Sequence, residues 1–203
     1  KGYAALILDD GTAQTLGVNP LGEAQRADRI AGALGRLAGM QIASGHFSMW
    51  GADDVDPTLT PYIGEFLLDA RDAGFAVPDK LLQDTLKALN EDVLSGGPQY
   101  YGRDHRDHLM FAYRAHAGFV LARVNRAPLG TLRALYDNDR GKAETGLPLV
   151  RLGLALWMQG DRKRGAKAIA EGFAFDDSKR PEWLGDYGTR IRDDAMMVAL
   201  VHE

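Results

Sequence analysis

The chain has 203 residues, of which 24 are Lys or Arg and 28 are Asp or Glu, so its formal net charge at pH 7 is −4. This length is sufficient for one domain with a hydrophobic core. The content of 45% hydrophobic and 26% charged residues is typical of a folded protein. An acidic chain without a basic run is a poor nucleic-acid binder, and no apolar stretch approaches the roughly 18 residues that cross a bilayer. We therefore expect one domain over residues 1–203, with no nucleic-acid partner and no direct membrane insertion.

The chain contains no cysteine, which excludes disulfides, thiolate metal sites and a cysteine nucleophile within these residues. No His-Glu-x-x-His motif or phosphate-binding loop occurs either, so we expect neither a cofactor nor a bound metal. The first residues lack the layout of an export signal, and the chain opens with Lys1 rather than Met. We expect it to be a piece of a longer protein.

Apolar residues recur at helical spacing along almost the whole chain, and the alternation typical of strands is nearly absent. The pattern and the Gly, Pro and Asp positions predict roughly eight helices. In chain order these cover residues 25–43, 56–74, 78–95, 105–125, a short stretch after Pro128, 147–159, 162–175 and 190–203. We therefore predict an all-α fold.

The predicted helices are paired by similar turns. The turn between Arg71 and Pro78 resembles that between Arg123 and Pro128, and each joins a long helix to the next one. Such antiparallel pairs cannot bury two faces alone, so they stack into a solenoid or close into a ring. Periodicity does not decide between these two forms.

Asp53, Asp54 and Asp56 form the densest acidic cluster. Carboxylates in a loop can bind a divalent cation or protonate a substrate. Asp56, however, is also placed to cap a helix that starts at Pro57, and adjacent side chains diverge unless the loop folds back. The structural interpretation is favoured.

His105 and His108 lie three residues apart at a predicted helix start, on neighbouring parts of one helix face. A neutral imidazole there can act as nucleophile or general base, because the positive end of a helix disfavours the protonated ring. Two histidines without a third ligand make a weak zinc site. The alternative is that both are polar caps on the surface.

The segment Gly45-His46-Phe47-Ser48-Met49-Trp50 places two aromatic rings in a turn between helices. Such rings either plug the end of a helix stack or form a ligand site. We favour the first interpretation for Phe47 and Trp50, because large aromatic side chains are mostly buried.

Several segments together resemble the thioester-containing domain of bacterial alpha-2-macroglobulin-type proteins. Residues 8–17 resemble the stretch just after the Cys-x-Glu-Gln thioester motif of that family, and residues 45–51 resemble its Gly-Gly-Phe-Ser-x-Trp turn. Residues 60–78, 126–129 and 186–193 match later helices and turns in family order. The matches extend over nearly the whole chain.

The resemblance implies an alpha/alpha toroid, with an inner and an outer ring of antiparallel helices as in terpenoid cyclases and protein prenyltransferases. It also implies a broad-range protease inhibitor of the periplasm, in which a Cys thiol and a Gln side chain form an internal thioester. Protease cleavage elsewhere exposes that bond, and a Lys amine of the protease is acylated. The implied partners are target proteases and neighbouring macroglobulin-type domains; whether the parent is anchored to the inner membrane stays open.

Because the chain has no sulfur nucleophile, residues 1–203 are expected to be most of such a domain without its Cys-x-Glu-Gln segment. Its role would be that of a scaffold that keeps the thioester dry, without catalytic activity of its own. Complement-type relatives use a histidine to relay the acyl group, which makes His105 and His108 the relay candidates. Candidates for sheltering the thioester or contacting other domains are Tyr3, Phe47, Trp50, Tyr100 and Tyr101.

Two other functions stay open on sequence grounds. The first is a toroid-fold enzyme, similar to a terpene cyclase or a glycosidase, that uses Asp53, Asp54 and Asp56. The second is a helical-repeat adaptor, whose helix pairs should recur at about 34 residues. The irregular spacing of Pro78, Pro128 and Gly160 disfavours the adaptor.

Overall fold

A computed structural model of the chain describes residues 2–48, 56, 58–98, 104–176, 178, 180–181, 184 and 186–202. Over these residues the chain is helical, and its only extended pairing is a single antiparallel bridge between Gln41 and Phe47. The α-helices are α1 (Gly2–Ile7), α2 (Asp10–Leu16), α3 (Glu23–Met40), α4 (Leu59–Asp72), α5 (Asp79–Ser95), α6 (Arg106–Arg123), α7 (Leu129–Asp139), α8 (Leu147–Met158), α9 (Arg162–Phe173) and α10 (Arg190–His202); a short 3-10 helix, η1 (Arg140–Lys142), follows α7. The predicted all-α class is confirmed.

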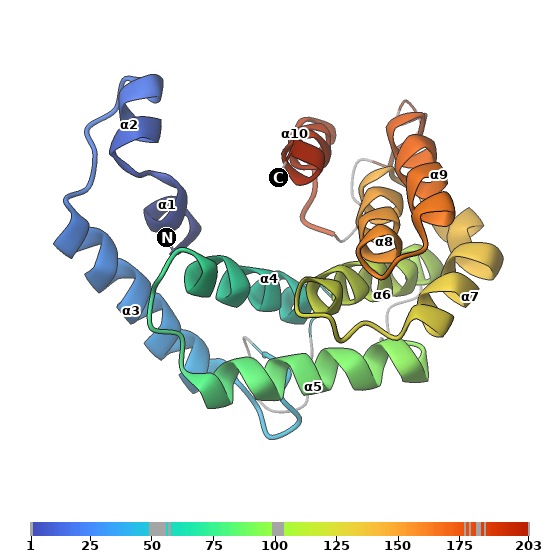
Figure 1. Ribbon diagram of the computed structural model, residues 1–203, viewed down its shortest axis with the longest axis horizontal. Helices are drawn as coiled ribbons and strands as arrows, with labels where there is room; N and C mark the ends of the chain where they lie inside the picture. Colours follow the sequence, from blue (N-terminus) through green and yellow to red (C-terminus); the bar gives the residue numbers. More distant parts are fainter. Residues whose placement is uncertain are drawn as a thin grey trace.

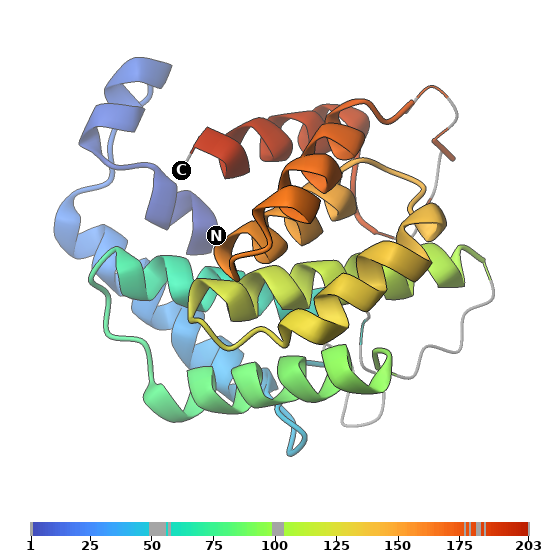
Figure 2. The same cartoon turned by 45° about the vertical axis from the view of Figure 1, so that its right-hand side comes forward.

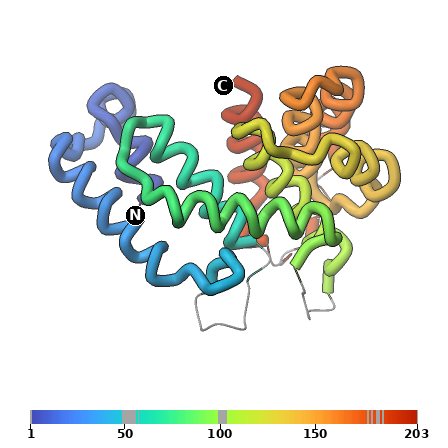
Figure 3. The backbone as a smooth tube through the Cα atoms, turned by 60° about the horizontal axis from the view of Figure 1, so that its bottom comes forward, coloured from blue at the N-terminus to red at the C-terminus, as the bar shows by residue number. Residues whose placement is uncertain are grey.

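The helices lie in two nested layers that curve around a common centre (Figure 1). Helices α1, α4, α6, α8 and α10 follow one another along the inner layer, and α3, α5, α7 and α9 cover them from outside. The turned view in Figure 2 and the tube in Figure 3 show the same order, with α5 running along the outside. This arrangement agrees with the expected toroid; closure of the ring between α10 and α1 stays a prediction.

Helix ends follow local capping chemistry. The Asp9 carboxylate accepts from the Thr12 N–H at 2.7 Å at the start of α2, and that of Asp161 accepts from the Arg164 N–H at 3.2 Å at the start of α9. Gly17 and Gly96, with φ of 65° and 105°, end α2 and α5 in the left-handed conformation that glycine adopts without strain. Each of the predicted helices overlaps one of α3 to α10.

Two helices were missed, and one predicted cap was wrong. Helices α1 and α2 were not predicted, because each is short and buries a single alanine. Asp56 is not the cap of α4, which begins at Leu59 with Thr58 as N-cap. The Asp56 carboxylate instead accepts from the N–H and the hydroxyl of Thr58, at 2.7 and 2.6 Å, in the turn before the helix.

The core lies between the two layers and along the inner helices. Its largest fully buried side chains are Tyr113, Phe47, Phe111, Ile30, Leu67, Leu68, Leu86, Leu89, Leu121, Leu132, Leu135 and Leu152. Removing apolar surface from water stabilises a fold by about 25 cal/mol per Å². These side chains come from α3 to α8 and from the turn after α3, so the core joins both layers.

The turn after α3 is fixed by buried contacts. Phe47 is fully buried, as predicted, and the imidazole Nε2 of His46 lies 2.8 Å from a carboxylate oxygen of Asp92 on α5. That carboxylate also accepts from the Tyr113 hydroxyl on α6. Gly45 has φ of 86° and would bring a Cβ within 2.4 Å of the Asp84 carbonyl oxygen, so a side chain there is excluded.

Helices α8 and α9 touch through their backbones. A Cβ on Gly165 would lie 2.7 Å from the Gly153 carbonyl oxygen and 2.9 Å from the Trp157 nitrogen. A Cβ on Gly172 would lie 2.8 Å from the Gly146 carbonyl oxygen. Since backbone atoms cannot move aside as a flexible side chain does, this close crossing requires glycine at both levels.

The variant Gly165→Ala should therefore reduce the free energy of unfolding by about 1–3 kcal/mol, the usual effect of overpacking a tight contact. Gly35→Ala is the matched control, since Gly35 lies in the exposed interior of α3 and a Cβ there would have nothing within 4 Å. The control should gain about 0.5–1 kcal/mol from helix propensity. Urea unfolding measures both; equal effects would contradict the close crossing.

Candidate functional site

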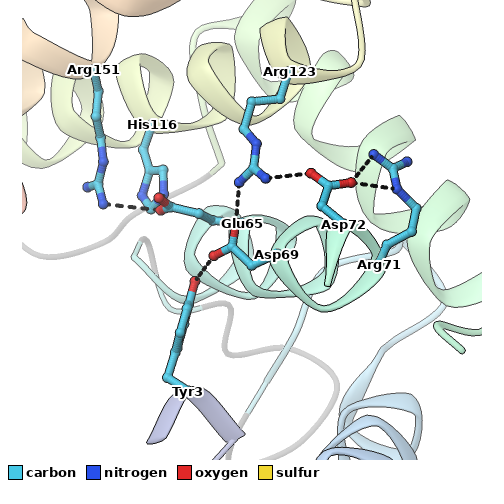
Figure 4. Close-up of polar contacts among 8 residues, drawn as sticks. All are labelled: Tyr3, Glu65, Asp69, Arg71, Asp72, His116, Arg123 and Arg151. Atoms are coloured by element: carbon cyan, nitrogen blue, oxygen red, sulfur yellow. Dashed lines mark hydrogen bonds and ion pairs between the residues drawn. The ribbon is translucent and has the colours of Figure 1, made fainter. Parts of the chain in front are cut away.

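One buried carboxylate joins three consecutive inner helices. The Oε2 atom of Glu65 on α4 lies 2.5 Å from Nε2 of His116 on α6 and 3.2 Å from Nη2 of Arg151 on α8 (Figure 4). The exposed fractions are 8% for Glu65, 6% for His116 and 6% for Arg151. A charge removed from water is tolerated when it is paired and hydrogen-bonded, as it is here.

A second set of ion pairs continues toward α1. The Tyr3 hydroxyl donates to Asp69 Oδ2 at 3.2 Å, and the guanidinium of Arg123 on α6 donates to Asp69 Oδ1. Arg123 also donates to Asp72 Oδ2 at 2.8 Å, and Asp72 pairs with Arg71 at 3.0 Å at the more exposed end of the set. Figure 4 shows the two sets next to each other, with no contact drawn between them; together they form a polar array across α1, α4, α6 and α8.

The protonation states in this array are set by competing effects. Burial alone would raise the pKa of Glu65, but the hydrogen bond and charge of His116 and the charge of Arg151 outweigh it and lower this pKa to about 2. Burial, followed by the charge of Arg151, lowers the pKa of His116 to about 4 against the opposing effect of Glu65. At neutral pH His116 is thus neutral and donates its Nε2–H to an ionised Glu65.

A cavity of about 380 Å³ lies beside this array and has His116 and Arg151 among its walls. Helices α4, α6, α8 and α10 and the segment before α10 surround it. Its polar lining residues are Asp56, Thr58, Tyr62, His108, Tyr113, His116, Thr145, Arg151, Asp186, Tyr187, Arg192 and Asp193. The apolar residues Leu59, Pro61, Leu109, Ala112, Leu147 and Pro148 complete the walls, so the lining is mixed.

The two candidate histidines meet at Glu144. The Nδ1 of His105 lies 2.7 Å from a Glu144 carboxylate oxygen, and the Nδ1 of His108 accepts the Glu144 backbone N–H at 3.0 Å. His105 precedes α6 with φ of 53° and is partly exposed, whereas His108 is fully buried and lines the cavity. The alternative that both are surface caps is therefore wrong for His108.

Tyr3 lies at a second cavity, of about 730 Å³, between α1, α3 and α4. Its ring packs against Tyr62 and Phe66 with centroid distances of 5.2 and 5.0 Å. Tyr62 is a wall of both cavities. Of the other predicted residues, Phe47 is in the core, while Trp50, Tyr100, Tyr101, Asp53 and Asp54 lie outside the described residues.

The described part of the chain holds no group of three or more His, Asp or Glu side chains arranged to bind a metal ion. The one described member of the predicted acidic cluster, Asp56, is engaged by Thr58 and accepts from the Tyr187 hydroxyl at 3.1 Å. Nor is any helix within the described ranges both long and apolar enough to cross a membrane.

Comparisons with known proteins connect this architecture to one family. No family model matches the chain. It is, however, 62% identical over 202 residues to the alpha-2-macroglobulin of Xylella fastidiosa and 35% identical over 208 residues to that of Escherichia coli, covering 99% of this chain in both cases. The chain spans 12% of the length of each of these relatives.

Solved structures agree. A crystal structure of native Escherichia coli alpha-2-macroglobulin, running from domain MG7 to the C-terminus, matches 98% of this chain with a TM-score of 0.90 and 33% identity, over 32% of its own length. The chain belongs to the bacterial alpha-2-macroglobulin family. The trypsin-activated Escherichia coli alpha-2-macroglobulin matches equally well, with a TM-score of 0.90 over 14% of its length.

Glu65, His116 and Arg151 were not among the site residues predicted from the sequence. Each is a charged or polar residue inside an otherwise apolar helical run, next to Phe66, Ala117 and Leu152 respectively. A charge in an apolar run is a signal of a buried pair. The partners, however, are separated by 51 and 86 residues, and only the stacking of the inner helices reveals them.

The variant Glu65→Ala should reduce the free energy of unfolding by about 3–5 kcal/mol, because it leaves the Arg151 charge buried without its partner. Glu91→Ala is the matched control, since the Lys87–Glu91 pair on α5 is exposed and 3.9 Å long. The control should change stability by less than about 1 kcal/mol. Chemical denaturation compares them, and similar losses would contradict the role given to Glu65.

The free energy of unfolding should fall as the pH drops from about 6.5 toward 2. The pKa of His116 is about 4 in the folded chain and about 6.5 in the unfolded chain. The pKa of Glu65 is about 2 in the folded chain and about 4.5 in the unfolded chain. Unfolding therefore takes up protons over this range, which favours the unfolded state.

The variant His116→Gln separates the two contributions, since it removes the titration between pH 6.5 and 4 and keeps a donor for Glu65. Its unfolding free energy should depend less on pH than that of the unmodified chain in this upper interval. Parallel curves for the two proteins would rule out the buried neutral histidine.

Proposed function

We propose that this chain is part of an alpha-2-macroglobulin-type protease inhibitor and that it shelters an internal thioester formed by residues upstream of Lys1. The observation that carries the proposal is the 62% identity to an alpha-2-macroglobulin over 99% of the chain. Structural relatives include Escherichia coli alpha-2-macroglobulin activated by trypsin and by porcine elastase. Target proteases and neighbouring domains of the parent are the partners that this role requires.

The walls of the smaller cavity suit a shelter. A thioester hydrolyses in water, so a resting inhibitor needs a site that excludes water until it is triggered. The apolar side chains of Leu59, Leu109 and Leu147 are among its walls, and the Tyr62 ring lines both this cavity and the second one at α1. Because α1 begins at the second cavity, the residues before Lys1 would enter this region.

His108 is the better placed of the two relay candidates. It lines the cavity, whereas the ring of His105 is held at the Glu144 carboxylate. In this role the segment supplies a scaffold and no turnover of its own. The periplasm is the compartment that we propose for the parent, in keeping with inhibition of exogenous proteases.

The decisive experiment uses the parent protein. We expect its sequence to place Cys-x-Glu-Gln shortly before Lys1, and trypsin treatment to yield covalent inhibitor–protease adducts on a reducing denaturing gel. Replacing that Cys by Ala should abolish the adducts. A parent without the motif, or adducts that persist in the Cys variant, would refute the thioester function.

The shelter itself is tested by Tyr62→Ala in the parent. Removing a ring that lines both cavities should give water more access to the thioester and raise the rate at which a free thiol appears in the resting protein, by about tenfold if the ring contributes about 1.4 kcal/mol to the protection. Leu94→Ala, at an exposed position on the outer helix α5, is the control and should leave the rate unchanged. Thiol release followed with a chromogenic disulfide reports both; an unchanged rate in the Tyr62 variant counts against the shelter.

A further inference from the structure

The turn after α3 carries a hydrogen-bonded chain of a serine, a histidine and a carboxylate. The Ser44 Oγ lies 2.9 Å from the His46 Nδ1, and the His46 Nε2 lies 2.8 Å from Oδ2 of Asp92 on α5. None of these three residues lines either of the two cavities. A hydroxyl within reach of an imidazole, whose other nitrogen is held by a third group, is the arrangement that activates a serine nucleophile.

The Asp92 carboxylate sets the direction of the protons in this chain. Burial raises the pKa of Tyr113 on α6, so its hydroxyl stays protonated and donates to Asp92 Oδ2. An ionised carboxylate only accepts hydrogen bonds, so a neutral His46 ring carries its proton on Nε2, the nitrogen that faces Asp92. Nδ1 then has a lone pair, and the Ser44 hydroxyl donates to it.

The turn that carries Ser44 and His46 is held by bonds in which the serine hydroxyl takes no part. The Ile42 N–H donates to the His46 carbonyl oxygen at 2.9 Å, and the Gly45 N–H donates to the Ile42 carbonyl oxygen at 2.9 Å. The side-chain amide of Gln41 donates to the Gly45 carbonyl oxygen at 3.2 Å. The hydroxyl and the imidazole are thus held in place by the backbone of the turn, which leaves the hydroxyl available for chemistry.

The two ends of this chain differ in their exposure to solvent. Ser44 is exposed, whereas only 13% of the His46 side chain and 9% of the Asp92 side chain are exposed. A small reagent can therefore reach the hydroxyl from solvent. The hydrogen bond between imidazole and carboxylate lies in a more shielded environment, where such bonds are electrostatically stronger than in water.

We propose that Ser44 is an activated nucleophile that accepts an acyl or phosphonyl group from an electrophile with a good leaving group, with His46 as its general base. Oγ forms a bond to the electrophilic carbon or phosphorus, its proton passes to His46 Nδ1, and the leaving group departs with the electron pair of the bond that breaks. Asp92 is a positioning residue that keeps the lone pair of the ring on Nδ1. The reaction involves no thioester, so it is independent of the proposed function.

The first test is labelling of the folded chain with an alkyl fluorophosphonate, which loses fluoride and leaves a stable phosphonate on the serine. Peptide mass spectrometry compares Ser44 with Ser95, an exposed serine on α5 whose hydroxyl donates to a backbone carbonyl oxygen at 3.5 Å. General-base catalysis typically contributes roughly 10²–10⁴-fold, so Ser44 should be labelled at least about 100-fold faster. Similar rates at the two serines would overturn the proposal.

The variant His46→Gln removes the base and keeps an N–H donor for Asp92. Labelling of Ser44 should fall to within a few-fold of that of Ser95, and the melting temperature of the variant checks that it is folded. Labelling of Ser44 at the unmodified rate in this variant would show that the imidazole is not the base, and would overturn the proposal.

The part played by Asp92 is tested by Asp92→Asn, with Glu91→Gln as the matched control. The Asn amide can donate to Nε2 and so favour the wrong tautomer of His46, which should slow labelling of Ser44 at least about tenfold. Glu91 is an exposed carboxylate next to Asp92 on the same helix, and its variant should keep the unmodified rate. An unchanged rate in Asp92→Asn, or an equal loss in both variants, would overturn the positioning role.

Discussion

The Glu65 carboxylate is the interaction on which the inner layer depends. It is the common acceptor for a histidine and an arginine from the next two inner helices, so a single buried charge sets the relative position of α4, α6 and α8. A buried ion pair contributes little net stability compared with well-packed apolar side chains, but breaking it is costly. The pair therefore favours the arrangement of the inner helices in which the Glu65 charge is paired, because other arrangements would leave it buried without a partner.

The rest of the site follows from that register. Because His116 and Arg151 are held at Glu65, their other faces become walls of the adjoining cavity. His108 lies about two turns before His116 on α6 and reaches the same cavity, where Glu144 orients its ring from the loop before α8. The polar array and the cavity thus share His116 and Arg151, which bind Glu65 and also line the cavity.

Much of the fold could be predicted from the sequence, because amphipathic spacing is a local property. The apolar stripes of α3 to α10 and the Gly, Pro and Asp positions between them located these helices to within a few residues. Helices α1 and α2 could not be found in this way, since each buries one alanine and has no stripe. The cavity could not be found either: His108 and Arg151 are far apart in the sequence, and their common wall exists only once α6 and α8 are side by side. Short segments such as residues 45–51 and 60–78 resembled the alpha-2-macroglobulin family, and the comparisons confirm that resemblance.

Tyr62 has a consequence for how the two hollow regions communicate. Its ring packs on Tyr3 and lines both cavities, and 41% of the residue is exposed, so both hollows border solvent beside it. A change in the orientation of this one side chain would therefore reshape both hollows at once. Because Tyr3 is on α1, a displacement of α1 would change the packing of a ring that also borders the cavity of His108 and Arg151.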